Sequence, residues 1–99
     1  MKASYSPQAL AQITQAFEYI VRDNPVAANA FLLRVESIVS LLLSRPGIGR
    51  PTQKPGVHVV SLQPYSYLLF YKVLPGRDET RIIRVRHMSR SDAADVRGL

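Results

Sequence analysis

Apolar side chains recur every three or four positions in the first part of the chain, which places them on one face of an α-helix. Between residues 8 and 22 these positions are Leu10, Ile13, Phe17, Ile20 and Val21. Ser6-Pro7 precedes them, and a capping serine followed by proline is a frequent helix start. The pattern therefore predicts an amphipathic helix that buries one face.

A second helix is predicted from Val26 to about Ser44, because Asp23-Asn24-Pro25 repeats the polar-residue and proline start and no breaker follows. The connection is so short that the two helices should form an antiparallel hairpin. The apolar stripe of this helix is widened by Leu32, Leu33, Val39 and Leu43. Such width fits a core helix and a helix that also contacts a second protein equally well.

The second half of the chain contains three runs of β-branched and aromatic residues, at His58–Leu62, Tyr67–Leu74 and Thr80–His87. Short turns separate them, so the three strands should pair as an antiparallel meander. Lys2–Tyr5 is a candidate edge strand. The segment from Arg45 to Gly56 holds three of the seven prolines and three of the five glycines, which predicts a loop.

Alternation along the last strand predicts that Ile83 and Val85 face the helices, whereas Ile82, Arg84 and Arg86 face away from them. The predicted fold class is therefore α+β: a short N-terminal strand, an α-helical hairpin on a three- to four-stranded antiparallel sheet, and a short C-terminal helix or tail. A chain of 99 residues is long enough for one hydrophobic core. We expect a single domain over residues 1–99.

Composition narrows the possible chemistry. Without cysteine the chain forms no disulfide and no thiolate metal site, and only His58 and His87 remain as soft ligands, so neither a metal nor a cofactor is expected. No stretch of the sequence approaches the roughly 20 apolar residues that a membrane span needs. The N-terminal residues lack the apolar segment of a secretory signal. We expect a cytoplasmic protein that does not enter a membrane.

The net charge of +6 is unevenly distributed along the sequence. Residues 1–49 carry four basic and three acidic side chains, a balance of +1, and residues 50–99 carry nine and four, a balance of +5. This asymmetry favours a surface that contacts an anion, either nucleic acid or an acidic protein segment. A basic surface that only maintains solubility is the alternative explanation.

The order and spacing of these elements resemble the RelE/ParE toxin superfamily of bacterial type II toxin-antitoxin systems over essentially the whole chain. The motifs that carry the resemblance are Ser6-Pro7-Gln8-Ala9, Asp23-Asn24-Pro25-Val26-Ala27-Ala28, Leu42-Leu43-Ser44-Arg45-Pro46-Gly47-Ile48-Gly49-Arg50-Pro51, Tyr67-Leu68-Leu69-Phe70-Tyr71-Lys72-Val73 and Ile82-Ile83-Arg84-Val85-Arg86-His87. The resemblance implies a plasmid-stabilisation or growth-arrest toxin, silent while an antitoxin wraps around it.

Two mechanisms occur in this superfamily. RelE-like members are endoribonucleases that cut messenger RNA on the ribosome, and ParE-like members are inhibitors of DNA gyrase without a known hydrolytic centre. Cleavage of RNA requires a proton acceptor, a proton donor and cations for the phosphorane charge. The residues of this chain that fit those roles are His87, Arg84, Arg86 and Arg90.

The ribonuclease set is incomplete, because the segment after the last strand lacks the tyrosine of RelE-like members, and the loop before the meander contains Lys54 alone where RelE-like members usually have several lysines. The arginine-valine-arginine-histidine ending is similar to ParE-like members. We therefore predict a ParE-like gyrase inhibitor, with no catalytic residue, and keep the RelE-like ribonuclease as the alternative. A structural role is a further possibility for His87.

The implied partner is a cognate ParD-like antitoxin, which should form a hetero-oligomer with this chain. A wide apolar helix and an arginine-bearing strand suit an acidic amphipathic segment that folds on binding. The predicted antitoxin-binding residues are Phe31, Leu32, Val35, Val39, Arg84 and Arg86. No helix-turn-helix pattern occurs, so sequence-specific DNA binding is not expected.

Overall fold

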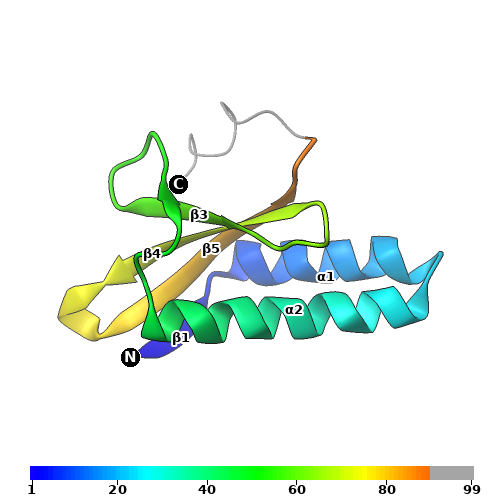
Figure 1. Ribbon diagram of the computed structural model, residues 1–99, viewed down its shortest axis with the longest axis horizontal. Coiled ribbons are helices and arrows are strands. Elements are labelled where there is room, and N and C mark those ends of the chain that lie inside the picture. The colour runs from blue at the N-terminus through cyan, green and yellow to red at the C-terminus, as the bar shows by residue number, and fades with distance from the viewer. Residues whose placement is uncertain (90–99) are drawn as a thin grey trace.

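The computed structural model describes residues 1–89, which form two helices packed on one face of a five-stranded sheet (Figure 1). The elements in chain order are β1 (Lys2–Tyr5), α1 (Pro7–Val21), α2 (Pro25–Ser44), β2 (Arg50–Pro51), β3 (Val57–Ser61), β4 (Tyr67–Leu74), the 3-10 turn η1 (Pro75–Arg77) and β5 (Glu79–His87). The predicted α+β class is confirmed, with one or two strands more than expected. Arg90 and the rest of the predicted C-terminal helix lie outside the described residues.

Both helix starts follow the predicted capping pattern. The side chain of Ser6 accepts a hydrogen bond from the Ala9 amide at 3.0 Å, and Asn24 Oδ1 accepts one from the Ala27 amide at 3.0 Å. Each cap satisfies an amide that has no partner inside its own helix. Ser6 also donates its own amide to the Ile82 carbonyl at 2.9 Å, so the start of α1 is tied to β5.

The helix side of the sheet carries the main hydrophobic core. From α2 the buried residues are Ala28, Phe31, Val35, Ile38, Val39 and Leu42. They pack with α1 and with buried side chains of the sheet such as Leu69, Tyr71 and Ile82. The width of the apolar stripe on α2 is thus largely explained by contacts within the chain.

The length and composition of α2 contradict the expectation that no segment of the chain is apolar enough to span a membrane. This helix has 20 residues and a mean hydropathy of 1.7, so its length and composition alone would suffice to cross a bilayer. The prediction was wrong because the many leucine, isoleucine, valine and phenylalanine residues of this helix outweigh the polar residues between them. Core helices of folded domains meet the same criterion, and one face of α2 is buried in this core.

The strand order is β1-β5-β4-β3-β2. The predicted meander is confirmed, because β3, β4 and β5 pair antiparallel in sequence order. β1 lies parallel to β5 at the edge of the sheet and ends opposite Ile82. Beyond that point Gln12 of α1 accepts the Val85 amide at 2.7 Å, which satisfies a backbone donor that β1 does not reach.

A β-bulge in β5 reverses part of the predicted alternation. Tyr71 lies opposite Ile82 and Phe70 lies opposite Arg84, so Ile83 is an extra residue without an opposing partner. Ile82 therefore joins Val85 in the core beneath the helices, whereas Ile83 packs on the other face. The prediction that Ile83 shares a face with Val85 was wrong, because one inserted residue shifts the two-residue period.

The loop before β3 is fastened to the core by Tyr71. Its buried hydroxyl accepts the Gly49 amide at 2.9 Å and donates to the Pro46 carbonyl at 2.7 Å. Burial is the main cause that raises the pKa of the Tyr71 hydroxyl, so this group stays protonated and remains a donor at neutral pH. The contact fixes the start of β2, which carries Arg50.

Gly49→Ala should destabilise the protein by about 1–3 kcal/mol, because an added Cβ would lie 2.5 Å from the Tyr71 hydroxyl oxygen. Gly47→Ala is the matched control, since a Cβ there meets nothing within 4 Å. Urea unfolding followed by circular dichroism measures both. Equal stability of the two variants would show that the loop moves away from Tyr71 without a loss of folding free energy.

Candidate functional site

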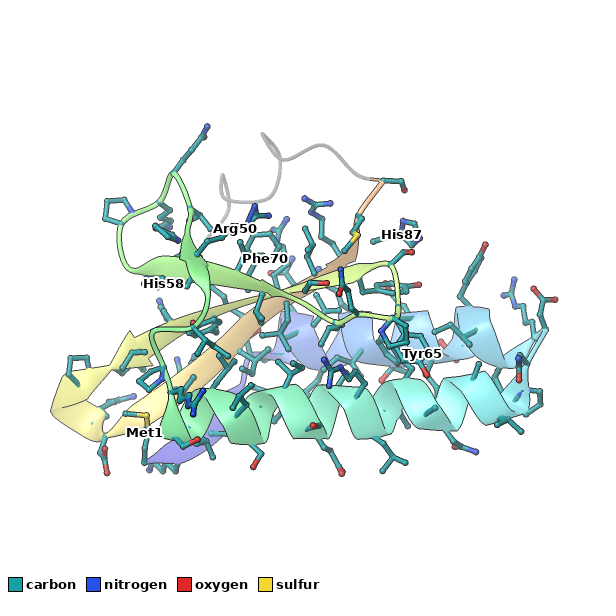
Figure 2. All side chains as sticks on the ribbon, viewed as in Figure 1. Met1, Arg50, His58, Tyr65, Phe70 and His87 are labelled. Carbon is teal, nitrogen blue, oxygen red and sulfur yellow. The ribbon has the colours of Figure 1, made fainter. Side chains whose placement is uncertain are left out.

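Basic side chains gather on the face of the sheet that points away from the helices. Residues directly opposite one another on paired strands project to the same face. The strand pairs therefore place six basic residues together on this surface, which we call the cationic face: Lys2, Arg50, Lys72, Arg81, Arg84 and Arg86. Arg50 and Phe70 are seen on this side of the sheet in Figure 2.

The centre of the cationic face is apolar. Its buried residues come from three strands and are Val57, Val59, Leu68, Phe70 and Ile83. The guanidinium of Arg86 lies 5.8 Å from the centre of the Phe70 ring and donates to the His87 carbonyl at 2.7 Å. Arg86 is thus held in place and is only 6% exposed, whereas Arg50 is exposed.

Glu79 is the one carboxylate that the strand pairs place on this face within residues 1–89. The Ser4 hydroxyl donates to it, and Arg81 forms an ion pair with it at 3.2 Å. The hydrogen bond from Ser4 is the main cause that lowers the pKa of Glu79, and Arg81 lowers it further. Glu79 thus neutralises part of the cationic face and stays ionised at neutral pH.

His87 lies on the opposite side of β5 from the two arginines. Its ring packs against Tyr67 with centroids 5.1 Å apart, and Tyr67 contacts Phe31 of α2 at 5.3 Å. The Nδ1 atom accepts the Ser89 amide at 3.1 Å, so the neutral ring carries its proton on Nε2. The Nδ1 atom is therefore already hydrogen-bonded, and the His87 ring does not lie on the face that carries Arg84 and Arg86.

The structure thus brings together only part of the predicted ribonuclease set. Arg84 and Arg86 share the cationic face, His87 is separated from them by the sheet, and Arg90 lies outside the described residues. His58, the other candidate soft ligand, stacks on Tyr71 with centroids 5.7 Å apart. Within residues 1–89 no group of three metal-ligating side chains is assembled.

The predicted antitoxin surface on α2 needs correction. Phe31, Val35 and Val39 are at most 5% exposed and lie in the core of the chain itself, because this face of α2 covers the sheet. Leu32 is half-buried and packs against the same core. The large apolar side chains that α2 does expose are Val26, Leu33 and Leu41.

Sequence reasoning missed most of the cationic face. It named Arg84 and Arg86 but left out Lys72 and Arg50. Alternation along β4 would have found Lys72, which is two residues from Phe70 on the same face. Arg50 had no such signal, because its side is fixed by pairing with Val59 across a two-residue strand.

Comparison with known proteins identifies the family that the chain resembles. Residues 3–92 match the family described as "ParE toxin of type II toxin-antitoxin system, parDE". No curated protein sequence matches the chain.

Solved structures share the fold. The chain is similar to the chromosomal ParDE system from P. aeruginosa, with a TM-score of 0.77 and 22% identity over 90% of this chain and 97% of that chain. The isolated E. coli RelE toxin gives a TM-score of 0.64 and 17% identity over 93% and 88%. The intact E. coli RelBE toxin-antitoxin complex gives 0.64 and 17% over 89% and 96%. The TM-scores show that these proteins share the fold of this chain.

Ser4→Ala should raise the pKa of Glu79 toward its ordinary value of 4.5, because the main hydrogen bond to the carboxylate is lost. A depressed folded-state pKa stabilises the fold at neutral pH, and this contribution disappears as the pH falls through that pKa. The variant should therefore unfold at a higher pH during acid titration. Carbon NMR of the Glu79 carboxyl and circular dichroism measure the two effects.

The control for this experiment is Ser40→Ala, which removes an exposed hydroxyl from α2. It should leave both the carboxyl titration and the acid transition unchanged. An unaltered Glu79 titration in Ser4→Ala would show that the hydrogen bond from Ser4 does not lower the pKa of Glu79.

Proposed function

Because the chain belongs to the ParE toxin family of type II toxin-antitoxin systems, we propose that it inhibits DNA gyrase and that a ParD-like antitoxin neutralises it. The observation that carries this choice is the separation of His87 from Arg84 and Arg86 by the sheet. The site is a binding surface, and the toxin acts by contact with another protein. It acts in the cytoplasm, arrests growth and so stabilises the element that encodes the pair.

A ribonuclease would need a different arrangement. Attack by a 2′-hydroxyl requires a proton acceptor within about 3 Å of that group and cations beside the same phosphate. Here the cations of the cationic face and the only described imidazole near them point in opposite directions from β5. The geometry therefore favours the ParE-like mechanism over the RelE-like alternative.

The cationic face also supports the choice of antitoxin. Within residues 1–89 the strand pairs place six basic side chains and one carboxylate on this surface, and such an excess of positive charge draws in an acidic segment and speeds its association. The apolar residues at the centre of the face are buried, so the charges around them carry the attraction for an acidic segment. The complex is a hetero-oligomer in which the toxin is inactive.

The purified chain should inhibit supercoiling by DNA gyrase or trap cleaved DNA at stoichiometric amounts. His87→Ala should inhibit as strongly as the unsubstituted chain, because no proton transfer is involved. Agarose-gel assays of relaxed plasmid DNA with gyrase and ATP measure this. Neither protein should cut messenger RNA on programmed ribosomes.

The opposite result would overturn the gyrase mechanism. If gyrase is unaffected at a large molar excess, and if His87→Ala abolishes ribosome-dependent cleavage of messenger RNA, the RelE-like alternative is correct. A catalytically inactive but folded His87→Ala protein, checked by circular dichroism, would make that conclusion secure.

The double variant Arg50→Glu and Lys72→Glu should bind the antitoxin at least about tenfold more weakly. It replaces two cations with carboxylates, which repel an acidic segment. The probe is the small protein encoded beside the toxin gene, titrated by calorimetry at two salt concentrations. Added salt should weaken the unsubstituted pair more than the variant pair.

The matched control is Arg22→Glu and Arg77→Glu, which makes the same charge change at exposed positions in the helical turn and in η1. It should alter the dissociation constant less than about threefold. Equal weakening of both variants would mean that net charge, and not the cationic face, governs the association.

A further inference from the structure

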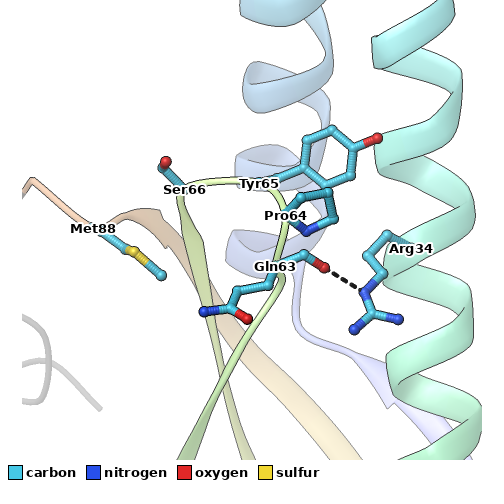
Figure 3. Close-up of a pocket in the computed structure, with 6 residues that line it drawn as sticks. All are labelled: Arg34, Gln63, Pro64, Tyr65, Ser66 and Met88. Carbon is cyan, nitrogen blue, oxygen red and sulfur yellow. Dashed lines mark hydrogen bonds between the residues drawn. The ribbon is translucent and has the colours of Figure 1, made fainter.

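A second surface feature lies between α2 and the turn that joins β3 to β4. It is an open pocket of about 680 Å³ (Figure 3). The residues that line it come from α2, from the turn and from the end of β5: Arg34, Gln63, Pro64, Tyr65, Ser66 and Met88. None of these residues belongs to the cationic face.

The walls of the pocket are held by contacts within the chain. Arg34 Nε donates to the Gln63 carbonyl at 2.6 Å, which ties the turn to α2. The Met88 amide donates to the Ser66 carbonyl at 2.9 Å, and the Tyr65 ring meets Phe31 edge-on at 5.6 Å. A preformed pocket of this kind loses little conformational entropy when a ligand binds.

Arg34 gives the pocket a positive charge that forms no ion pair with an acidic side chain of residues 1–89. Among residues 1–89 the ion pairs are Met1 with Asp78 and Arg81 with Glu79, so neither involves Arg34. Its only hydrogen bond in that part of the chain uses Nε, which leaves the two terminal amino groups available. Arginine presents such groups in a fork that matches a carboxylate.

The lining also includes three apolar or aromatic side chains, Pro64, Tyr65 and Met88, beside the polar Gln63 and Ser66. Pro64 is exposed, Met88 is 40% exposed, and Tyr65 is half-buried with its ring against the core. Arginine, tyrosine and methionine are the residue types enriched in protein interfaces. A phosphodiester strand is bound by several cations in a row, and this pocket offers one. The lining therefore suits a protein segment better than a nucleic acid.

We propose that this pocket anchors the antitoxin by receiving one carboxylate, paired with Arg34, and an adjoining apolar side chain that packs on Tyr65 and Met88. This inference rests on the proposed function and adds a second contact site to it. Met88 directly follows β5, the strand that carries Arg84 and Arg86, so an acidic segment on the cationic face reaches the pocket at the end of that strand. The net charge of +6 on the toxin favours association with an acidic partner.

Arg34→Gln should weaken binding of the small protein encoded beside the toxin gene about tenfold, because a charge-assisted hydrogen bond between toxin and antitoxin is lost. Met88→Glu leaves Arg34 and its bond to Gln63 intact but puts a competing carboxylate into the pocket, so it should weaken binding similarly. Arg22→Gln removes one exposed charge elsewhere and should change the dissociation constant less than about twofold. Calorimetry with full-length proteins measures all three.

Three outcomes would overturn the anchor. If Arg34→Gln and Met88→Glu both bind as Arg22→Gln does, the antitoxin ignores the pocket, while its neutralising role stands. If both bind normally but no longer inhibit gyrase, the pocket serves the target. If the unsubstituted toxin does not bind the small protein encoded beside its gene at all, the antitoxin part of the proposed function fails, and the anchor fails with it.

Discussion

The pairing of β4 with β5 is the constraint on which the rest of the structure depends. Side chains of these central strands project to both faces of the sheet. The extra residue Ile83 determines which residues of β5 face the helices and which face away. Without the bulge, Ile82 would leave the core beneath the helices. With it, Ile82 and Val85 pack against α1 and α2, and the arginines that follow the bulge stay on the opposite face. A local break in a strand thus separates the hydrophobic layer from the charged one.

This separation gives the two faces of the sheet different roles. The helix side uses the apolar residues of α2 to form the core, so the wide stripe of that helix is mostly occupied by the chain itself. The other side collects cations from four strands around an apolar centre. Tyr71 links the two faces. Its ring is buried in the core, and its hydroxyl holds the loop that precedes Arg50.

The same division bears on mechanism. Catalysis of RNA cleavage needs an acid-base group and cations on one side of one phosphate, whereas inhibition by binding needs only a complementary surface. His87 is held against Tyr67 and by the Ser89 amide, away from the cationic face. Met88, which directly follows β5, lines the same pocket as Arg34 of α2.

The sequence by itself determined the features that depend on neighbouring residues. Ser6 and Asn24 were recognisable as helix caps, and the meander followed from short turns between apolar runs, since these signals act within a few positions. Arg84 and Arg86 were identified as facing away from the helices. Only the tertiary structure decided the burial of Phe31, Val35 and Val39, the position of Ile83 in a bulge, and the side on which Arg50 lies. Strand register and helix packing depend on contacts between residues far apart in the chain. The spacing of neighbouring residues therefore does not determine which face of a helix or strand is buried.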